Sequence, residues 1–248
     1  HFENARIENL ISRARSQLDG RADVIVSAYV PDHRATPPIF SRYPFAKPFF
    51  KSDFDALGYP AKVGGAEWRF IPGNGDLVPL ALWREQPAYR RIWLMEGDVE
   101  YTGDLGTLLT RFDASNADLL CTSVRPMPRN WHQEWLLRLP PDWPEPQAPV
   151  LGFLPFFRAS DRLLAALDRF YRDGGAGHHE QTWPLVAREA GLSIEDIGGG
   201  GPYTRPENRR RHYSSTPPRT MLFPGTFRFR PSMRRVGREP EMLWHPVK

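Results

Sequence analysis

The sequence predicts an α/β fold in one domain, residues 1–248, with a mainly parallel central sheet flanked by helices. Short β-branched apolar segments alternate along the chain with segments whose apolar residues recur at helical spacing, and 248 residues is the length of one large domain. No segment approaches the run of about 18 apolar residues that a membrane helix needs. The single cysteine, Cys121, excludes an intrachain disulfide and a cysteine zinc site, which favours a cytoplasmic protein.

The first half of the chain is predicted to begin with an amphipathic helix, because apolar residues recur every three or four positions before the stop signal Asp19-Gly20. The run ADVIVSAYV then predicts a buried strand, and the proline- and aromatic-rich segment after it predicts a long loop. The predicted elements are a helix over 4–18, a strand over 22–30, helices over 52–57 and 76–84, a strand over 91–99, a helix over 105–112 and a strand over 117–124.

The second half continues with a proline-rich loop over 125–149 and an apolar strand over 150–157. Ser160 is placed to cap a helix over 161–172, which Gly174-Gly175 ends. A further helix is expected over 179–190 and a hairpin over 226–236. We expect residues 1–124 to form a nucleotide-binding half and residues 125–248 to hold the acceptor site and the tail.

Positive charge is concentrated at the end of the chain. Residues 205–248 contain eleven arginines and lysines but only three acids, although the whole chain carries a net charge of only +4. Such a tail indicates a polyanionic partner, for example a phosphorylated small molecule or anionic lipid headgroups. A nucleic acid is not expected, since the chain contains none of the usual nucleic-acid-binding motifs.

Three acids follow the apolar segment 92–95: Glu96, Asp98 and Glu100. If the strand continues through them, alternate residues point the same way and the carboxylates share one face. Carboxylate oxygens suit hard divalent cations, and ligands bind at the carboxyl ends of strands in open α/β sheets. The sequence therefore predicts a metal site here. The alternative is a solvated end of a strand.

The segment WLMEGDVE, followed by Gly-Asp-Leu and a helix, resembles the metal-binding DxD region of GT-A-fold glycosyltransferases. The resemblance implies a GT-A-like domain that binds Mn²⁺ or Mg²⁺ and a nucleotide-sugar donor, with a UDP-sugar as the commonest choice. Asp98 would hold the ion and Glu96 would be its neighbouring acid. This chain departs from the motif by having Glu rather than Asp at the first acidic position, which leaves open how much metal the site retains.

Glu180 follows two histidines at the predicted start of a helix, where inverting enzymes of the resembled fold have their general base. Such a base takes the proton from the attacking acceptor hydroxyl. An acid at a helix N-terminus is alternatively only a cap, and His178 and His179 are alternatively metal ligands. Their adjacent positions argue against the last option, since the metal-binding HExxH pattern needs a four-residue spacing.

The resemblance also assigns the remaining candidate residues. By the resemblance, the late His245 would be a third metal ligand, or alternatively it is a half-buried histidine beside Trp244. Arginines of the tail would anchor the diphosphate, or alternatively they belong to a solvated basic hairpin. Aromatic side chains of the 131–143 loop would form a platform for the acceptor sugar, or alternatively hold the loop onto the core. The predicted donor-binding residues are Ser27, Tyr29, Asn74, Asp76, Glu100, Arg228 and Arg230, and the predicted acceptor-binding residues are Trp131, Trp135 and His179.

These observations predict a metal-dependent, inverting glycosyltransferase that acts on a carbohydrate or lipid-linked acceptor. Bacterial surface-polysaccharide synthesis at the inner face of a membrane fits this prediction, since the basic tail suits contact with anionic lipid. Two alternatives stay open: a magnesium-dependent nucleotidyltransferase or phosphohydrolase, and a non-catalytic polyanion-binding protein that uses the tail. The sequence specifies neither the donor sugar and base, nor the acceptor, nor the oligomeric state.

Overall fold

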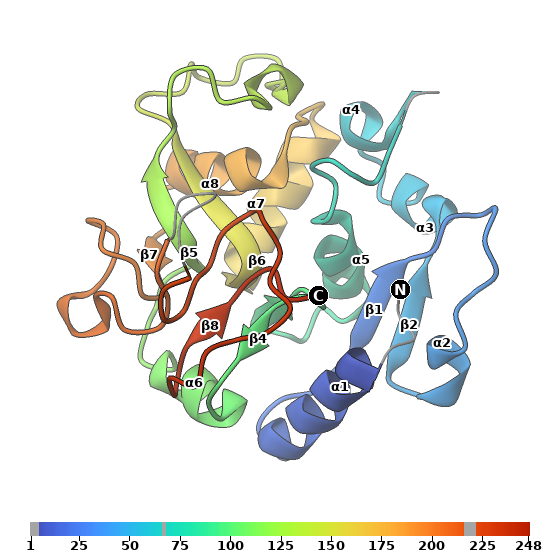
Figure 1. The fold of residues 1–248 in the computed structure, drawn as a ribbon. Helices are drawn as coiled ribbons and strands as arrows, with labels where there is room; N and C mark the ends of the chain where they lie inside the picture. Colours follow the sequence, from blue (N-terminus) through green and yellow to red (C-terminus); the bar gives the residue numbers. More distant parts are fainter. Residues whose placement is uncertain (1–4, 66–67, 216–221) are drawn as a thin grey trace.

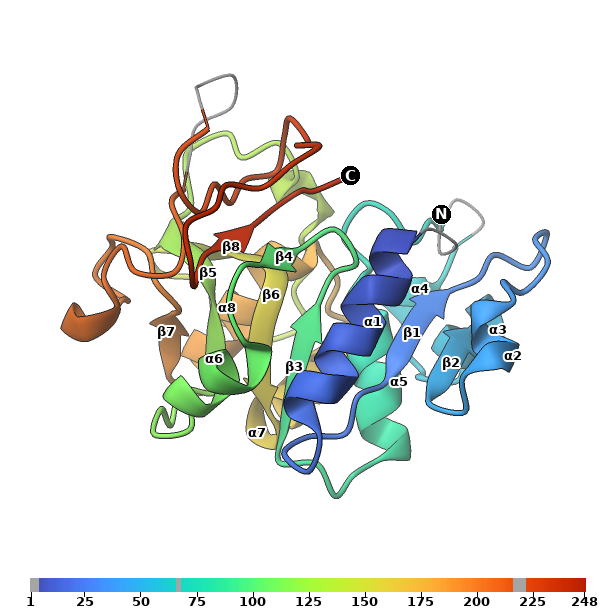
Figure 2. The ribbon, with the colours of Figure 1, turned by 60° about the horizontal axis from the view of Figure 1, so that its bottom comes forward.

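The computed structural model describes residues 5–65, 68–215 and 222–248, without the side chain of Trp135. Its centre is a four-stranded sheet in the order β3-β6-β5-β7, whose strands lie side by side across Figure 2. The remaining strands form two separate pairs: β1 and β2 are parallel, and β4 and β8 are antiparallel. The strands are β1 Val26–Tyr29, β2 Ala46–Phe49, β3 Arg91–Met95, β4 Glu100–Tyr101, β5 Leu119–Pro126, β6 Val150–Ser160, β7 Ile194–Asp196 and β8 Leu243–Trp244.

Helices alternate with these strands along much of the chain (Figure 1). The α-helices are α1 Ala5–Leu18, α2 Ile39–Arg42, α3 Lys51–Asp55, α4 Pro60–Val63, α5 Leu77–Glu85, α6 Leu105–Arg111, α7 Asp161–Arg172 and α8 His179–Glu189, and two 3₁₀ turns are η1 Glu134–Leu136 and η2 Pro206–Asn208. The α/β class is therefore confirmed. Within the described residues, no helix is long and apolar enough to cross a membrane.

The expectation of a mainly parallel sheet is wrong. Strand β6 runs antiparallel to both of its neighbours, β3 and β5, while only β5 and β7 are parallel to each other. The cause lies in the connection from β5 to β6, residues 127–149, which contains only the short turn η1. A parallel neighbour needs a crossover that carries the chain back to the other edge of the sheet, and this loop returns at the edge where β5 ended. The result is a mixed sheet.

The core has two parts, one on each face of the sheet. Leu119 and Cys121 of β5 point into a cluster with α5, α7 and α8, whereas Leu120 between them points into a second cluster with α6, β4 and β8. The alternation follows from the two-residue period of a strand. Because both faces are covered, β5 has the continuous apolar sequence of a buried strand rather than an alternating one.

Several element boundaries differ from the predicted ones. The strand expected over 91–99 ends at Met95, and the hairpin expected over 226–236 is absent. Residues of that segment instead form single bridges with distant partners: Thr226 with Ser214, Phe227 with His245, and Met233 with Val247. The hairpin does not form because the backbone of this segment bonds to His245 and Val247, which follow β8, and not to the other half of the segment. Strands β2 and β7 fall in segments for which no strand was predicted.

Candidate functional site

The chain turns sharply where β3 ends. Glu96 donates its backbone N–H to the carbonyl of Pro155 at 2.8 Å, and its own carbonyl accepts from Val99 at 3.0 Å. The Val99 side chain is fully buried and anchors the turn in the core. Glu96 and Asp98 therefore reach the edge of the sheet through a turn, not through the continued strand that the sequence predicted.

The end of the chain returns to this turn. Strand β8 pairs with β4, which sets Trp244 opposite Glu100, and Val247 donates its N–H to the carbonyl of Asp98 at 2.8 Å. This pairing brings the ring of His245 onto the acids: its Nε2 lies 3.3 Å from Asp98 Oδ1 and 3.7 Å from Glu96 Oε2. The structure thus brings together the three residues that the sequence proposed as metal ligands.

The other ring nitrogen of His245 fixes which atom faces the acids. Nδ1 lies 2.7 Å from the carbonyl oxygen of Arg228, which can only accept, so Nδ1 carries a proton and donates it. Burial by itself lowers the pKa of His245, but hydrogen bonds and charge from Asp98 and Glu96 outweigh it and raise the pKa to about 9. Without a cation, a protonated His245 therefore balances the two carboxylates.

The donor set suits a divalent cation. One ligand atom from each of Glu96, Asp98 and His245 lies within 4.8 Å of the other two. Two carboxylates and one imidazole form a set that Mn²⁺ accepts well and Mg²⁺ less naturally. Binding of an ion would release the proton from Nε2, because only the neutral imidazole has a lone pair to offer. Lys248, whose Nζ lies 3.9 Å from Asp98 Oδ2, adds a positive charge beside the set.

Burial of the Asp98 carboxyl group by itself raises its pKa, but His245 and Lys248 outweigh burial, and the pKa lies below its usual value. Asp98 is therefore ionised at neutral pH. An ionised carboxylate is the form that coordinates a cation, and an incoming ion would replace the proton of His245 beside it.

A further acid, Glu180, interacts electrostatically with Glu96 and His245. Burial and the charge of Glu96 raise its pKa, Arg125 and His245 lower it, and the net result is a pKa of about 8. Glu180 lies in the first turn of α8, whose N-cap is His178: the Nδ1 of His178 accepts the Glu180 backbone N–H at 3.3 Å. The Glu180 side chain is therefore not needed as the cap, and it is half-buried.

The two histidines before Glu180 are packed rather than free. The rings of His178 and His179 stack with centroids 4.7 Å apart, and the edge of Trp131 meets His178 at 5.4 Å. Burial lowers the pKa of His178 to about 2, so this ring is neutral and can accept the cap hydrogen bond. His179 lines the large cleft described below.

A buried lysine joins the loops that flank this region. Lys62 Nζ donates to the carbonyls of Gly73 at 2.9 Å and Gly177 at 2.7 Å, and it lies 3.1 Å from Asp76 Oδ1. The other carboxylate oxygen of Asp76 accepts from Tyr171 and Trp183. Asp76, a predicted donor-binding residue, is thus 2% exposed and held by these side chains.

The turn that contains Glu96 and Asp98, residues 96–99, is here called the acid turn, and it lines a cleft of about 1880 Å³. Its walls come from α1, from β1 with the residues after it, and from β3 with the acid turn. Ser27 and Tyr29, which were predicted to bind the donor, line it together with His179 and Lys248. Tyr29 is fixed by stacking on Phe70, with ring centroids 4.9 Å apart. The cleft therefore joins the predicted donor and metal residues.

Two predicted donor-binding residues, Glu100 and Asn74, have other partners than Glu96, Asp98 and His245. Glu100 is paired with Arg13 at 2.6 Å and with Arg6 at 3.8 Å, both on α1, because the turn at 97–98 rotates it away from Asp98. Asn74 donates its side-chain amide to the carbonyl of Arg69 at 2.7 Å and stabilises its own turn. Neither contact tests a role in donor binding, which stays a prediction.

Arg228 is buried and donates from Nε to the carbonyl of Pro231 at 3.2 Å, whereas Arg230 is exposed beside the ring of Phe229. Trp131 is buried against His178. Trp135 belongs to η1, but its side chain falls outside the described part of the structure.

Lys62 is the residue of this region that sequence reasoning missed. Its signal was a single lysine in the otherwise apolar segment Tyr59–Val63, but nothing in the sequence indicated its distant partners.

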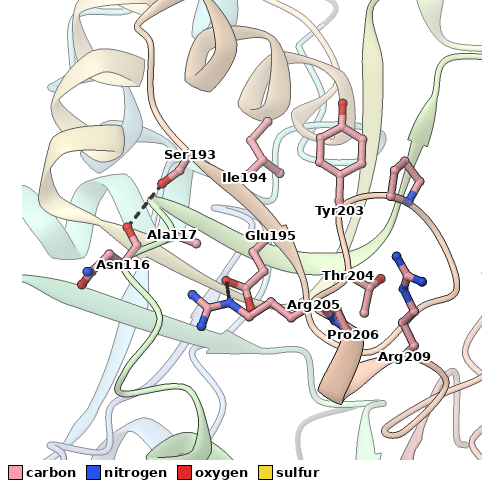
Figure 3. Close-up of a pocket in the computed structure, with 11 residues that line it drawn as sticks. Asn116, Ala117, Ser193, Ile194, Glu195, Tyr203, Thr204, Arg205, Pro206 and Arg209 are labelled. Atoms are coloured by element: carbon pink, nitrogen blue, oxygen red, sulfur yellow. Dashed lines mark hydrogen bonds and ion pairs between the residues drawn. The ribbon is translucent and has the colours of Figure 1, made fainter.

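A second pocket, of about 520 Å³, lies at the opposite edge of the sheet, where β5 and β7 begin (Figure 3). Its carboxylate, Glu195, is already neutralised by Arg205 at 2.9 Å and accepts from Ser115 at 2.8 Å. The pocket contains no cluster of metal-ligating side chains among the described residues. The cleft at the acid turn is therefore the better candidate for catalysis.

The chain was also compared with known proteins. No protein-family model matches it, and no curated protein sequence matches it.

Proposed function

We propose that this protein is a metal-dependent, inverting glycosyltransferase that moves a sugar from a nucleoside-diphosphate donor to a hydroxyl acceptor. The observation that carries the proposal is the convergence of Glu96, Asp98 and His245, of which the two acids line a large cleft. The GT-A-like fold remains part of the proposal, as does the assignment of residues 1–248 to a single domain.

The donor set fits Mn²⁺ or Mg²⁺, and the bound ion would supply positive charge for the departing diphosphate. Glu96, Asp98 and His245 would hold it, and the hydrogen bond from His245 Nδ1 to the Arg228 carbonyl keeps Nε2 directed at the two acids. Lys248 adds charge of the same sign beside Asp98. Ser27 and Tyr29, which also line the cleft, would contact the nucleoside.

Glu180 would act as the general base. Its raised pKa makes its carboxylate a stronger base than an ordinary glutamate, which favours proton transfer from an acceptor hydroxyl. Asp98 stays ionised beside His245 and Lys248, which lower its pKa, whereas burial raises the pKa of Glu180. This separation of pKa values is the pattern by which acid and base roles are divided between carboxyl groups.

The test is a screen of sugar nucleotides with and without Mn²⁺. We expect UDP or another nucleoside diphosphate to raise the melting temperature only when Mn²⁺ is present, because a bound ligand stabilises the folded state by mass action. Asp98→Asn should abolish this shift, while Asp113→Asn, at an exposed acid after α6, should retain it. An identical shift in Asp98→Asn, or none in the wild type with any nucleotide, would refute the metal assignment.

Product analysis separates the proposal from the other enzyme classes. A transferase releases the nucleoside diphosphate and passes the sugar to an acceptor or, slowly, to water. A phosphohydrolase or nucleotidyltransferase that used the same acids would break a phosphate bond instead and release a sugar phosphate or inorganic phosphate. Detection of only those products would replace the proposed reaction without moving the metal site.

A further inference from the structure

The C-terminal segment exposes an unusual share of apolar surface. Among the described residues, five large hydrophobic side chains are exposed, and three of them lie within residues 222–229. Leu222 is 52% exposed, Phe223 51% and Phe229 67%. Single exposed apolar residues are normal on protein surfaces, so the charged residues near these three decide what the segment can bind.

Arginines lie close in the sequence to Phe229, the most exposed of these three residues. Arg230, Arg234 and Arg235 are all exposed, and within the described part of the chain none of them forms an ion pair with a carboxylate. The Arg230 guanidinium lies 5.6 Å from the centre of the Phe229 ring. One aromatic ring and three unpaired guanidinium groups therefore share a single short turn, residues 228–235, here called the arginine turn.

The arginine turn is held in place by its ends. Phe227 before it and Met233 within it are buried, and their backbones bridge to His245 and Val247. Met233 donates its N–H to the carbonyl of Pro246 at 2.8 Å, and Lys248 donates to that of Met233 at 2.8 Å. These contacts fix the backbone on both sides of Phe229, whose side chain is 67% exposed.

The turn is joined directly to the candidate metal site. The carbonyl of Arg228 accepts the hydrogen bond from His245 Nδ1, and the Arg228 N–H donates to the His245 carbonyl at 3.1 Å. Figure 2 shows the C-terminal segment, in red, along the upper edge of the molecule beyond β8. A surface that bound the arginine turn would therefore lie beside the cleft.

We propose that the arginine turn docks the protein on an anionic lipid bilayer, with Phe229 in the interface and Arg230, Arg234 and Arg235 on lipid phosphates. Guanidinium groups bind phosphate with two parallel hydrogen bonds, and basic residues gain affinity from the negative potential of the bilayer surface. Aromatic rings with an apolar face favour the lipid–water interface. The proposal goes beyond the transferase reaction and stands independently of it.

A bilayer fits this surface better than a nucleic acid does. Single-stranded nucleic acids need aromatic rings spaced along a basic groove, whereas the large cleft is lined by Glu96 and Asp98, which repel a polyphosphate chain without a metal. Leu222, an aliphatic side chain, has no face for stacking on a base but partitions readily into lipid. Phe229, finally, projects from a turn rather than from the wall of a groove.

The test is co-sedimentation of the full chain with vesicles of phosphatidylglycerol and phosphatidylcholine in equal parts, and with vesicles of phosphatidylcholine alone. We expect binding to the first and little to the second, weakening as salt rises. The triple variant R230E/R234E/R235E should lose at least about 100-fold in affinity, since each arginine removed costs about 5-fold. Phe229→Ser should weaken binding to the anionic vesicles without changing its dependence on salt.

The matched control is R169E/R209E/R210E, which makes the same change in net charge at exposed arginines of α7 and of the segment after η2 that form no ion pair within the described residues. If docking uses the arginine turn, the control should bind nearly as the wild type does. Equal losses in both triple variants, no binding of the wild type to anionic vesicles, or metal-independent binding to a random oligonucleotide in place of vesicles would each overturn the proposal. Unchanged melting temperatures show that the variants fold.

Discussion

Replacement of Lys62 by Met tests whether the buried lysine holds together the loops that flank the candidate site. The ammonium group is almost fully buried, lies 3.1 Å from Asp76 and donates to the carbonyls of Gly73 and Gly177. Met fills a similar volume but leaves the Asp76 carboxylate without its cation. Removal of one partner from a buried pair costs about 3–5 kcal/mol. We expect Lys62→Met to lower the free energy of unfolding by about 4 kcal/mol.

Urea denaturation followed by tryptophan fluorescence measures this effect. With a slope of about 2.5 kcal/mol per molar urea, a loss of about 4 kcal/mol lowers the midpoint by about 1.5 M. Lys47→Met is the matched control, because Lys47 forms an exposed pair with Glu85. Exposed pairs contribute at most about 1 kcal/mol, so the control midpoint should move by less than about 0.4 M.

The variants Asp76→Asn and Lys62→Met/Asp76→Asn separate the effect of the buried charge from the loss of the other hydrogen bonds of Lys62. Asparagine at 76 still accepts the hydrogen bonds from Tyr171 and Trp183 but carries no buried charge. The double variant should therefore be more stable than Lys62→Met alone, with a coupling energy of about 2 kcal/mol or more. Additive effects within about 0.5 kcal/mol would refute the reasoning, because they would mean that Lys62 and Asp76 do not depend on each other.

Three further predictions follow from buried polar groups. Glu180→Gln should lower kcat by about 100-fold or more while leaving nucleotide affinity unchanged, with exposed Glu189→Gln as control; an unchanged kcat would exclude Glu180 as the base. Burial lowers the pKa of His178 to about 2 in the folded state, so below pH 6.5 the unfolded chain binds a proton that the folded chain does not. The free energy of unfolding therefore falls with pH, and His178→Asn should make this fall smaller. Wild type should lose about 2 kcal/mol more than this variant between pH 6.5 and 5, measured by urea unfolding; parallel curves would contradict this. Arg158→Met should cost about 3 kcal/mol in the same assay, since its guanidinium donates to three backbone carbonyls of residues 112–117; a loss below about 1 kcal/mol would contradict this.

Local signals in the sequence were sufficient for most elements. The helix predicted over 161–172 has those bounds in the structure, because Ser160 caps it as expected and accepts the N–H of Leu163 at 3.1 Å. Helix α5 begins directly after Asp76, within one residue of its predicted start. Such boundaries depend on neighbouring residues, and periodicity with capping describes those interactions well.

Strand direction was decided by tertiary structure. The apolar sequence of β6 predicted a buried strand correctly, but a continuous apolar run reads the same in parallel and antiparallel neighbours once both faces are covered. The direction followed from the path of the 127–149 loop, which the sequence does not specify. Strand β7 was missed for a related reason: three residues give too short a pattern, and its partner β5 is distant in the chain.

The sequence by itself determined the chemistry available to the candidate site: Glu96 and Asp98 after an apolar strand, and a late His245 with arginines before it. Only the tertiary structure decided which groups meet. The turn at 97–98 separates Glu100 from the other acids, and the pairing of β8 with β4 delivers His245 to them. The physical reason is that side-chain types are local, whereas pKa values, ion pairs such as Lys62 with Asp76, and ligand sets depend on packing between residues far apart in the chain.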